Sequence, residues 1–129
     1  MPRLASVYAK MLGEKISTHN TAVYLINTGW SGGPYGVGKR IKIEYSRAMV
    51  TAVINGSLDI VKFSHNDLFN LDVPTECPGV PSEVLEPRNT WVDKDSYDLS
   101  AKKLAQMFVD NFKKFKDASE EIRSAGPKL

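Results

Sequence analysis

The residues best suited to chemistry lie in a glycine-rich stretch, TGWSGGPYGVGK, which ends at Lys39. Its second half, residues 33–39, satisfies the first seven positions of the phosphate-binding pattern GxxxxGK[ST]. Arg40 then stands where that pattern needs the serine or threonine whose hydroxyl holds magnesium. A P-loop also opens a helix directly, whereas an alternating segment follows here, so we exclude a true P-loop.

Two interpretations of the glycine-rich stretch remain. Glycines let a backbone approach a ligand closely, and Lys39 with Arg40 can hold phosphate oxygens. A plain connection with solvated basic ends explains the same residues. Trp30 either stacks on a base or anchors the loop. Ser46 stands at the start of an expected helix, where it either caps the helix or joins free backbone N–H groups in binding an anion.

Other reactive residue types give no complete site. His19 and His65 have no cysteine or carboxylate neighbours at metal-ligand spacing. Cys77 has no basic neighbour to activate its thiol as a nucleophile. No Ser-His-Asp arrangement and no acid and base pair of carboxylates is evident, so the residues predict no catalytic group and no metal ligand.

Apolar periodicity predicts helices near both ends of the chain. Apolar residues recur at three- and four-residue spacing over residues 4–16 and again over residues 101–115. We expect the second stripe to face the core, with Asp95 or Ser96 capping its helix. A shorter helix is expected over residues 119–124.

Between these helices the pattern favours a mixed α/β fold. Residues 22–27 form a short apolar run typical of a buried strand, and residues 40–45 alternate like a half-buried strand. Residues 46–55 return to helical spacing before Gly56, and a short strand is expected over residues 60–63. Several prolines between residues 74 and 87 indicate extended or turn segments. We expect one α/β domain over residues 1–129.

Composition narrows the function classes. The chain has 129 residues, 42% hydrophobic and 25% charged, as in an ordinary globular domain. A net charge of +2 does not suggest a general nucleic-acid binder, and no apolar run is long enough to cross a membrane. The single cysteine and the lack of an apolar signal region near the N-terminus lead us to expect a cytoplasmic protein.

Three ordered motifs resemble one known family. These are NTGW at residues 27–30, GVGKRI at residues 36–41, and the Pro-Gly-Val to Pro-Arg-Asn-Thr stretch at residues 78–90. With their spacing, they closely resemble the C-terminal part of the ATP-dependent phosphoenolpyruvate carboxykinases, over about residues 8–129. The fold that the resemblance implies is a mixed α/β subdomain of the carboxykinase nucleotide-binding domain.

The resemblance implies a gluconeogenic, cytoplasmic enzyme that decarboxylates oxaloacetate and phosphorylates the enolate with ATP. The products are phosphoenolpyruvate, ADP and carbon dioxide, and the ions are magnesium with manganese or calcium. The positions that match the family's nucleotide contacts are Arg40, Ile41 and Ser46, the last a serine where the family has threonine. Serine keeps the hydroxyl, so the contact is expected to survive.

The family's phosphate-binding loop, metal ligands and catalytic residues lie outside this region. We therefore expect a carboxykinase fragment that supplies adenine-side contacts to ATP, has no metal ligands or catalytic residues of its own and is inactive alone. Oxaloacetate and phosphoenolpyruvate would be partners only of the full-length enzyme, and neither nucleic acid nor membrane is expected. The alternative is a non-catalytic structural module that binds no ligand and self-associates through faces normally covered. A stand-alone P-loop NTPase ranks third.

Overall fold

The computed structural model describes residues 3–129. Met1 and Pro2, at the start of the segment in which no secretory signal is expected, lie outside the described residues. The described elements, in chain order, are α1 (Ala5–His19), β1 (Trp30–Ser31), β2 (Lys39–Arg40), α2 (Ile43–Ile54), β3 (Phe63–Asn66), β4 (Leu71–Pro74), α3 (Ser82–Leu85), α4 (Pro87–Thr90), α5 (Lys94–Phe112) and α6 (Glu120–Ser124). Helices and small sheets alternate, which confirms the mixed α/β class.

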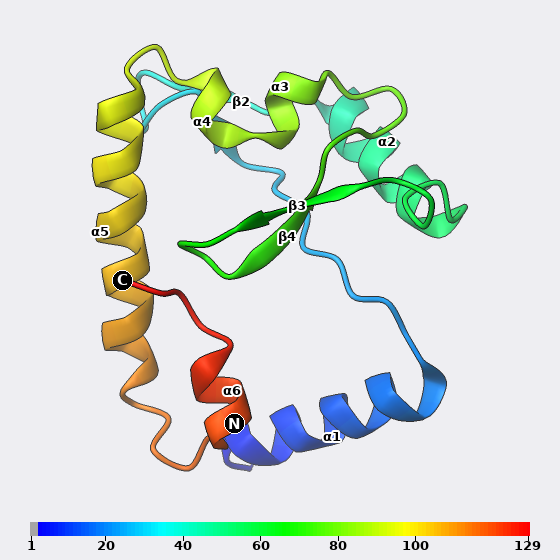
Figure 1. The fold of residues 1–129 in the computed structure, drawn as a ribbon, viewed down its shortest axis with the longest axis vertical. Helices are drawn as coiled ribbons and strands as arrows, with labels where there is room; N and C mark the ends of the chain where they lie inside the picture. The colour runs from blue at the N-terminus through cyan, green and yellow to red at the C-terminus, as the bar shows by residue number, and fades with distance from the viewer. Residues whose placement is uncertain (1–2) are drawn as a thin grey trace.

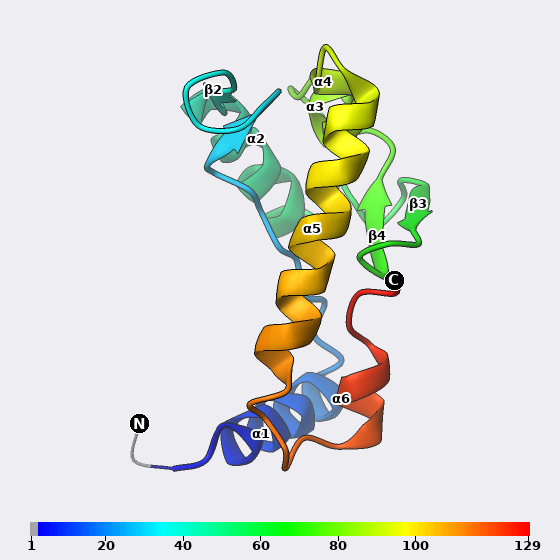
Figure 2. The ribbon, with the colours of Figure 1, turned by 90° about the vertical axis from the view of Figure 1, so that its left-hand side faces the viewer.

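The elements form an open frame (Figure 1). The long helix α5 runs along one side, α2, α3 and α4 lie at one end, and α1 lies crosswise at the other. In Figure 2, which is turned by 90° about the vertical axis, α1 again lies apart from the hairpin formed by β3 and β4. The C-terminal segment returns to that hairpin, where the Lys128 N–H donates to the Leu68 carbonyl at 2.9 Å.

The glycine-rich stretch forms a tight antiparallel hairpin. Trp30 pairs with Arg40 and Ser31 pairs with Lys39, so the ends of the stretch are short strands. The turn closes on Pro34, whose carbonyl accepts from the N–H groups of Val37 and Gly38 at 3.0 and 2.9 Å.

Two predicted strands before and after this hairpin are wrong. Residues 22–27 run without strand pairing, and Leu25 is 83% exposed. An apolar run becomes a strand only where a neighbour completes its backbone hydrogen bonds, and this run has none in the described chain. The strand expected over residues 40–45 stops after Arg40, because its partner β1 has two residues; α2 begins at Ile43.

The centre of the chain also departs from expectation. The strand predicted over residues 60–63 instead runs from Phe63 to Asn66, and Ile60 is 92% exposed. The proline-rich segment holds two one-turn helices, α3 and α4, where only turns were expected. Proline is tolerated at a first helical position, as at Pro87 in α4.

Both C-terminal helices were predicted. Asp93 caps α5, accepting from the N–H groups of Asp95 and Ser96. The expected cap at Asp95 or Ser96 was therefore wrong, because the helix begins earlier, at Lys94. Hydrogen bonds from Ser96, through its hydroxyl and its N–H, lower the pKa of Asp93. Ser119 caps α6 through the Ile122 N–H.

The buried core is small. It comprises Ala52, Leu58, Cys77 and Val80, with Gly79 packing on Ala48 of α2. On α5, Ala101 and Ala105 are buried, but Phe108 on the same stripe is 53% exposed, so the core-facing stripe that we expected is only partly covered. Within residues 3–129, no helix combines the length and apolar character needed to cross a bilayer.

The first prediction concerns Gly38. A β-carbon there would lie 2.4 Å from the Gly33 carbonyl oxygen and 2.8 Å from that of Ser31, both backbone atoms that cannot swing away. We expect Gly38→Ala to open the hairpin and to speed amide hydrogen exchange of residues 37–41, with α5 amides unchanged.

Gly13→Ala is the matched control, because a β-carbon at Gly13 meets nothing within 4 Å. Alanine there should stabilise α1 by about 0.5–1 kcal/mol through helix propensity. Unchanged exchange in the Gly38 variant would show that the hairpin tolerates a side chain at its narrowest point.

Candidate functional site

The candidate site is the β1–β2 hairpin together with the start of α2. The Ile41 N–H donates to the Gly29 carbonyl at 2.8 Å, which fixes the backbone just beyond Arg40. The Gly29 N–H donates to the Asn27 side-chain oxygen at 2.8 Å, so the NTGW segment braces the same point. The hairpin thus holds Arg40 and Ile41 in a defined place before α2 begins.

Arg40 and Lys39 offer positive charge to solvent. Both side chains are exposed, and in residues 3–129 neither forms an ion pair or a side-chain hydrogen bond. Lys42 differs, because its ammonium lies 5.2 Å from the Tyr45 ring centre and 3.4 Å from Glu44. A hydrogen bond with Tyr45, and then one with Glu44, raises the pKa of Lys42. Arg40 and Lys39 therefore remain available to an anionic ligand.

Ser46 lies elsewhere than the sequence indicated. It is the fourth residue of α2, and its N–H already donates to the Lys42 carbonyl at 3.2 Å. The helix begins at Ile43, so the last three residues of the expected strand, 43–45, are helical and not extended. The predicted role of Ser46 as a helix cap or as part of a free N–H cluster was therefore wrong. Its half-buried side chain remains on the helix that follows Arg40 and Ile41.

Trp30 packs within the hairpin. Its ring meets that of Tyr35 edge to face, with 5.6 Å between the ring centres. Of the two roles left open for Trp30, this contact favours an anchor for the loop.

Thr90 holds the hairpin against the body of the chain, and sequence reasoning missed it. The Thr90 hydroxyl donates to the Pro87 carbonyl at 2.7 Å, so it accepts from the Ser31 hydroxyl 3.0 Å away. Gly32 lies so close that a β-carbon would approach the Thr90 carbonyl oxygen to 3.1 Å. The only signal in the sequence is that the 78–90 motif ends at Thr90.

The segment that carries Thr90 is itself tied to α5. The Lys94 ammonium donates to the carbonyls of Arg88, Asn89 and Trp91 at 2.8, 3.0 and 2.9 Å. These are carbonyls at the C-terminal end of α4, where positive charge is favourable. Arg88 forms two hydrogen bonds of 2.9 Å with Asp98 of α5, which lower the pKa of that carboxyl.

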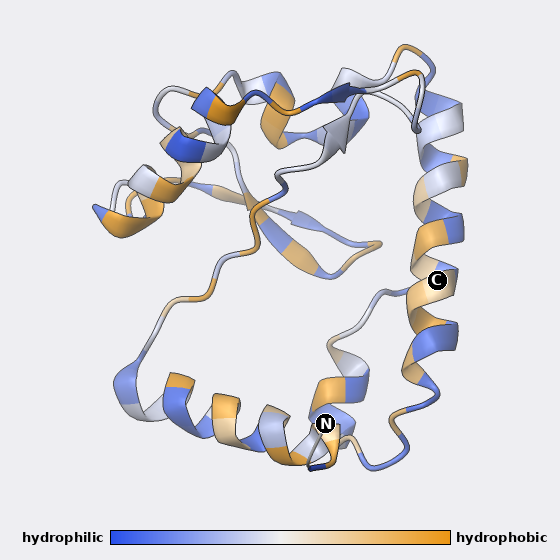
Figure 3. Ribbon diagram, turned by 180° about the vertical axis from the view of Figure 1, so that it is seen from behind, coloured by the Kyte–Doolittle hydropathy of each residue, from blue (hydrophilic) through white to orange (hydrophobic). Residues whose placement is uncertain are grey.

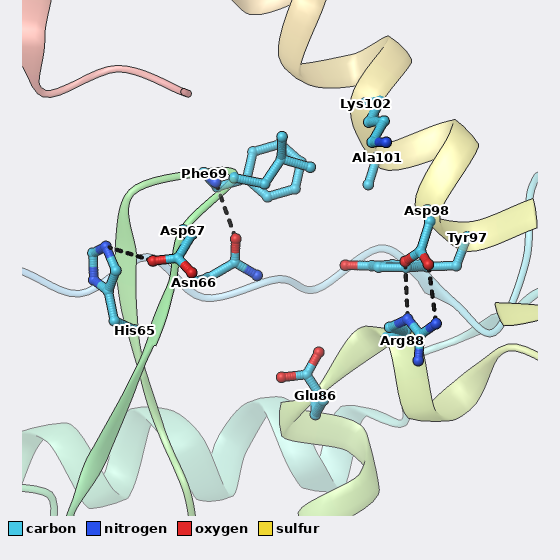
Figure 4. A pocket seen from close by; sticks show the side chains of 11 residues that line it. His65, Asn66, Asp67, Phe69, Glu86, Arg88, Tyr97, Asp98, Ala101 and Lys102 are labelled. Carbon is cyan, nitrogen blue, oxygen red and sulfur yellow. Dashed lines mark hydrogen bonds and ion pairs between the residues drawn. The ribbon is translucent and has the colours of Figure 1, made fainter. Parts of the chain in front are cut away.

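A shallow hollow of about 370 Å³ lies between the β3–β4 turn and the start of α5 (Figure 4). Arg88 pairs with Asp98, and the His65 ring contacts Asp72 at 2.8 Å and Asp67 at 3.9 Å. Glu86 and Lys102 also line the hollow and form no ion pair with the described residues. Burial is the main cause that raises the pKa of Tyr97 beside it. Because the two unpaired charges, those of Glu86 and Lys102, are of opposite sign, the hollow does not favour an ion of one sign.

No metal centre is found in the part of the chain that the structure describes. Among residues 3–129, no group of three or more histidine, cysteine, aspartate or glutamate side chains is arranged so that it could hold a metal ion. The described side chains therefore do not fit a divalent ion. Cys77 is buried, and burial raises the pKa of its thiol, which opposes a nucleophilic role.

The chain is thus a mixed α/β protein whose glycine-rich β1–β2 hairpin ends in two exposed basic residues, Lys39 and Arg40. The family model described as "Phosphoenolpyruvate carboxykinase" matches residues 1–83. The chain is 61% identical to "Phosphoenolpyruvate carboxykinase (ATP)" of Caldanaerobacter subterraneus subsp. tengcongensis over 128 residues, which is 99% of this chain and 25% of that protein. The proteins of the same name from Fusobacterium nucleatum (60% identical, 99% of this chain, 25% of theirs) and Brevibacillus brevis (53%, 100% and 24%) are similar.

The chain therefore belongs to the phosphoenolpyruvate carboxykinase family. It spans about a quarter of the length of these curated relatives.

The second prediction tests the anchor at Thr90. Thr90→Val keeps the shape of the side chain but removes its hydrogen bonds to Ser31 and Pro87. Losing them should cost about 1–2 kcal/mol of local stability, and exchange of the Ile41 N–H should accelerate roughly five- to thirtyfold.

Thr51→Val is the control, since Thr51 is exposed on α2 and its hydroxyl makes no hydrogen bond to the described residues. Equal exchange rates in the two variants would exclude an anchoring role for Thr90.

Proposed function

We propose that this chain acts as one segment of an ATP-dependent phosphoenolpyruvate carboxykinase and supplies contacts to the nucleotide. The observation that carries the proposal is 61% identity over 99% of the chain to a relative named for ATP. The reaction so implied converts oxaloacetate and ATP to phosphoenolpyruvate, ADP and carbon dioxide.

The contacts proposed are those of Arg40, Ile41 and Ser46. The exposed Arg40 guanidinium suits an anionic or polar ligand, because it presents several donors in a fixed plane. The bond between the Ile41 N–H and the Gly29 carbonyl supports the choice of Ile41, since its side chain then has a fixed position beside Arg40. Ser46 offers a hydroxyl from the helix that follows.

The rest of the reaction is assigned to the other three quarters of the longer enzyme. Phosphoryl transfer depends on metal ions and clamped phosphates, and no group among residues 3–129 fits a metal. We propose that this chain corresponds to the carboxyl end of those enzymes, with the motifs at residues 27–30, 36–41 and 78–90 as the support. Its role would be to position the nucleotide, while chemistry takes place on groups elsewhere.

The third prediction uses a full-length chimera in which this chain replaces the matched quarter of the Caldanaerobacter relative. Arg40→Ala should weaken ATP binding by the chimera roughly tenfold or more, because a hydrogen bond to a charged group is lost. Titration calorimetry at fixed magnesium measures the change in Kd.

Lys103→Ala is the matched control, since Lys103 is an exposed cation on α5, away from the hairpin. An equal loss of affinity in both variants would mean that net charge matters and the hairpin does not. A second chimera, with this chain at the amino end, tests its placement; ATP binding by that arrangement alone would overturn the carboxyl-end proposal.

The fourth prediction concerns the chain alone. Supplied with oxaloacetate, ATP, magnesium and manganese, it should form no phosphoenolpyruvate above background, because no group within residues 3–129 could hold a metal ion. The intact Caldanaerobacter relative is the positive control in the same coupled assay. Robust turnover by the 129-residue chain would refute the division of labour proposed above.

A further inference from the structure

The chain exposes far more surface than a compact protein of its size. A compact monomer of 14.3 kDa exposes about 6,800 Å², whereas this chain exposes 9855 Å². The excess, about 3,000 Å², is larger than the roughly 800 Å² that each partner buries in a stable interface. This chain therefore has enough uncovered surface for at least one extensive interface.

Helix α1 carries the best-ordered part of that surface. No residue of α1 is buried. Its large apolar side chains, together with that of the preceding residue, form one stripe that we call the α1 stripe: Leu4, Tyr8, Met11 and Leu12, exposed by 68%, 38%, 49% and 61%. At 100° per residue these four positions fall within about 100° of the helix circumference. Such a stripe is typical of a helix that packs on another surface.

The other face of α1 is polar. Lys10 and Glu14 lie there one turn apart, 4.0 Å from each other and well exposed. In Figure 3 orange and blue segments alternate along α1, which lies at the edge of the molecule. Its start is held by a hydrogen bond from the Ser6 hydroxyl to Asp117, which leaves the α1 stripe uncovered.

We infer that the α1 stripe docks on the remaining three quarters of the carboxykinase chain. The inference rests on the proposed function only in taking that chain as the partner. In the relatives this segment is about a quarter of one polypeptide, so the partner surface is covalently tethered. Tethering gives it a high effective concentration, which favours it over a second copy of this chain. The connector between α1 and β1 (residues 20–29) also exposes apolar side chains, those of Val23 and Leu25.

Thiol labelling of single cysteine variants tests this inference. Leu12→Cys reports on the α1 stripe and Lys10→Cys on the polar face, and each is placed in the isolated chain and in the full-length chimera. The isolated chain should react fast with maleimide at both positions. In the chimera, labelling at position 12 should slow about tenfold or more, with position 10 unchanged. Mass spectrometry of the labelled peptide separates these sites from other cysteines.

The labelling rate can also be measured without a chimera. For this, cysteine is introduced into the intact Caldanaerobacter relative at the position aligned with Leu12. Fast labelling at position 12 in the intact relative overturns the inference. Labelling at position 12 of the isolated chain that slows as its concentration rises also overturns it, because a second copy then covers the stripe. A protected position 12 in a chimera that does not bind ATP would leave the docking surface standing and reject the proposed function alone.

Discussion

The junction between α4 and α5 holds the parts of this chain in place. One ammonium group, that of Lys94, satisfies three carbonyls at the end of a one-turn helix that is too short to be stable by itself. The paired hydrogen bonds between Arg88 and Asp98 add a second link to α5. Thr90, at the end of α4, then holds Ser31 of the glycine hairpin. The junction thus links the hairpin to a segment that is distant from it in sequence.

The hairpin combines a rigid turn with unpaired positive charge. Gly38 permits a close backbone approach that a side chain would block. Arg40 follows at the end of β2 with its guanidinium exposed. A charged group on a fixed backbone loses little entropy when it binds an anion, which is the physical basis for assigning nucleotide contacts here. The hollow beside α5 lacks this property, because the unpaired charges that line it, those of Glu86 and Lys102, are of opposite sign.

The open shape and the family membership have a common explanation. The described core has few buried residues, while large apolar side chains on α1, α5 and the connector remain exposed. Apolar surface of this extent is stabilised when it is removed from water. A segment that forms about a quarter of a longer polypeptide would gain that burial from the rest of its chain. In the two proposals made above, the apolar surface joins the rest of the longer polypeptide and the hairpin faces the nucleotide.

Sequence alone predicted helices around residues 4–16, 101–115 and 119–124, because helical periodicity and capping are local properties. The structure places them at Ala5–His19, Lys94–Phe112 and Glu120–Ser124. Sequence also determined the family, since several motifs agree in order and spacing, and it singled out Arg40. Tertiary structure decided what depends on partners distant along the chain. Residues 22–27 found no neighbouring strand, the strand at Arg40 ended with its two-residue partner, and Ser46 fell inside a helix. Thr90 acquired its role only because folding brings it to Ser31, 59 residues away in sequence.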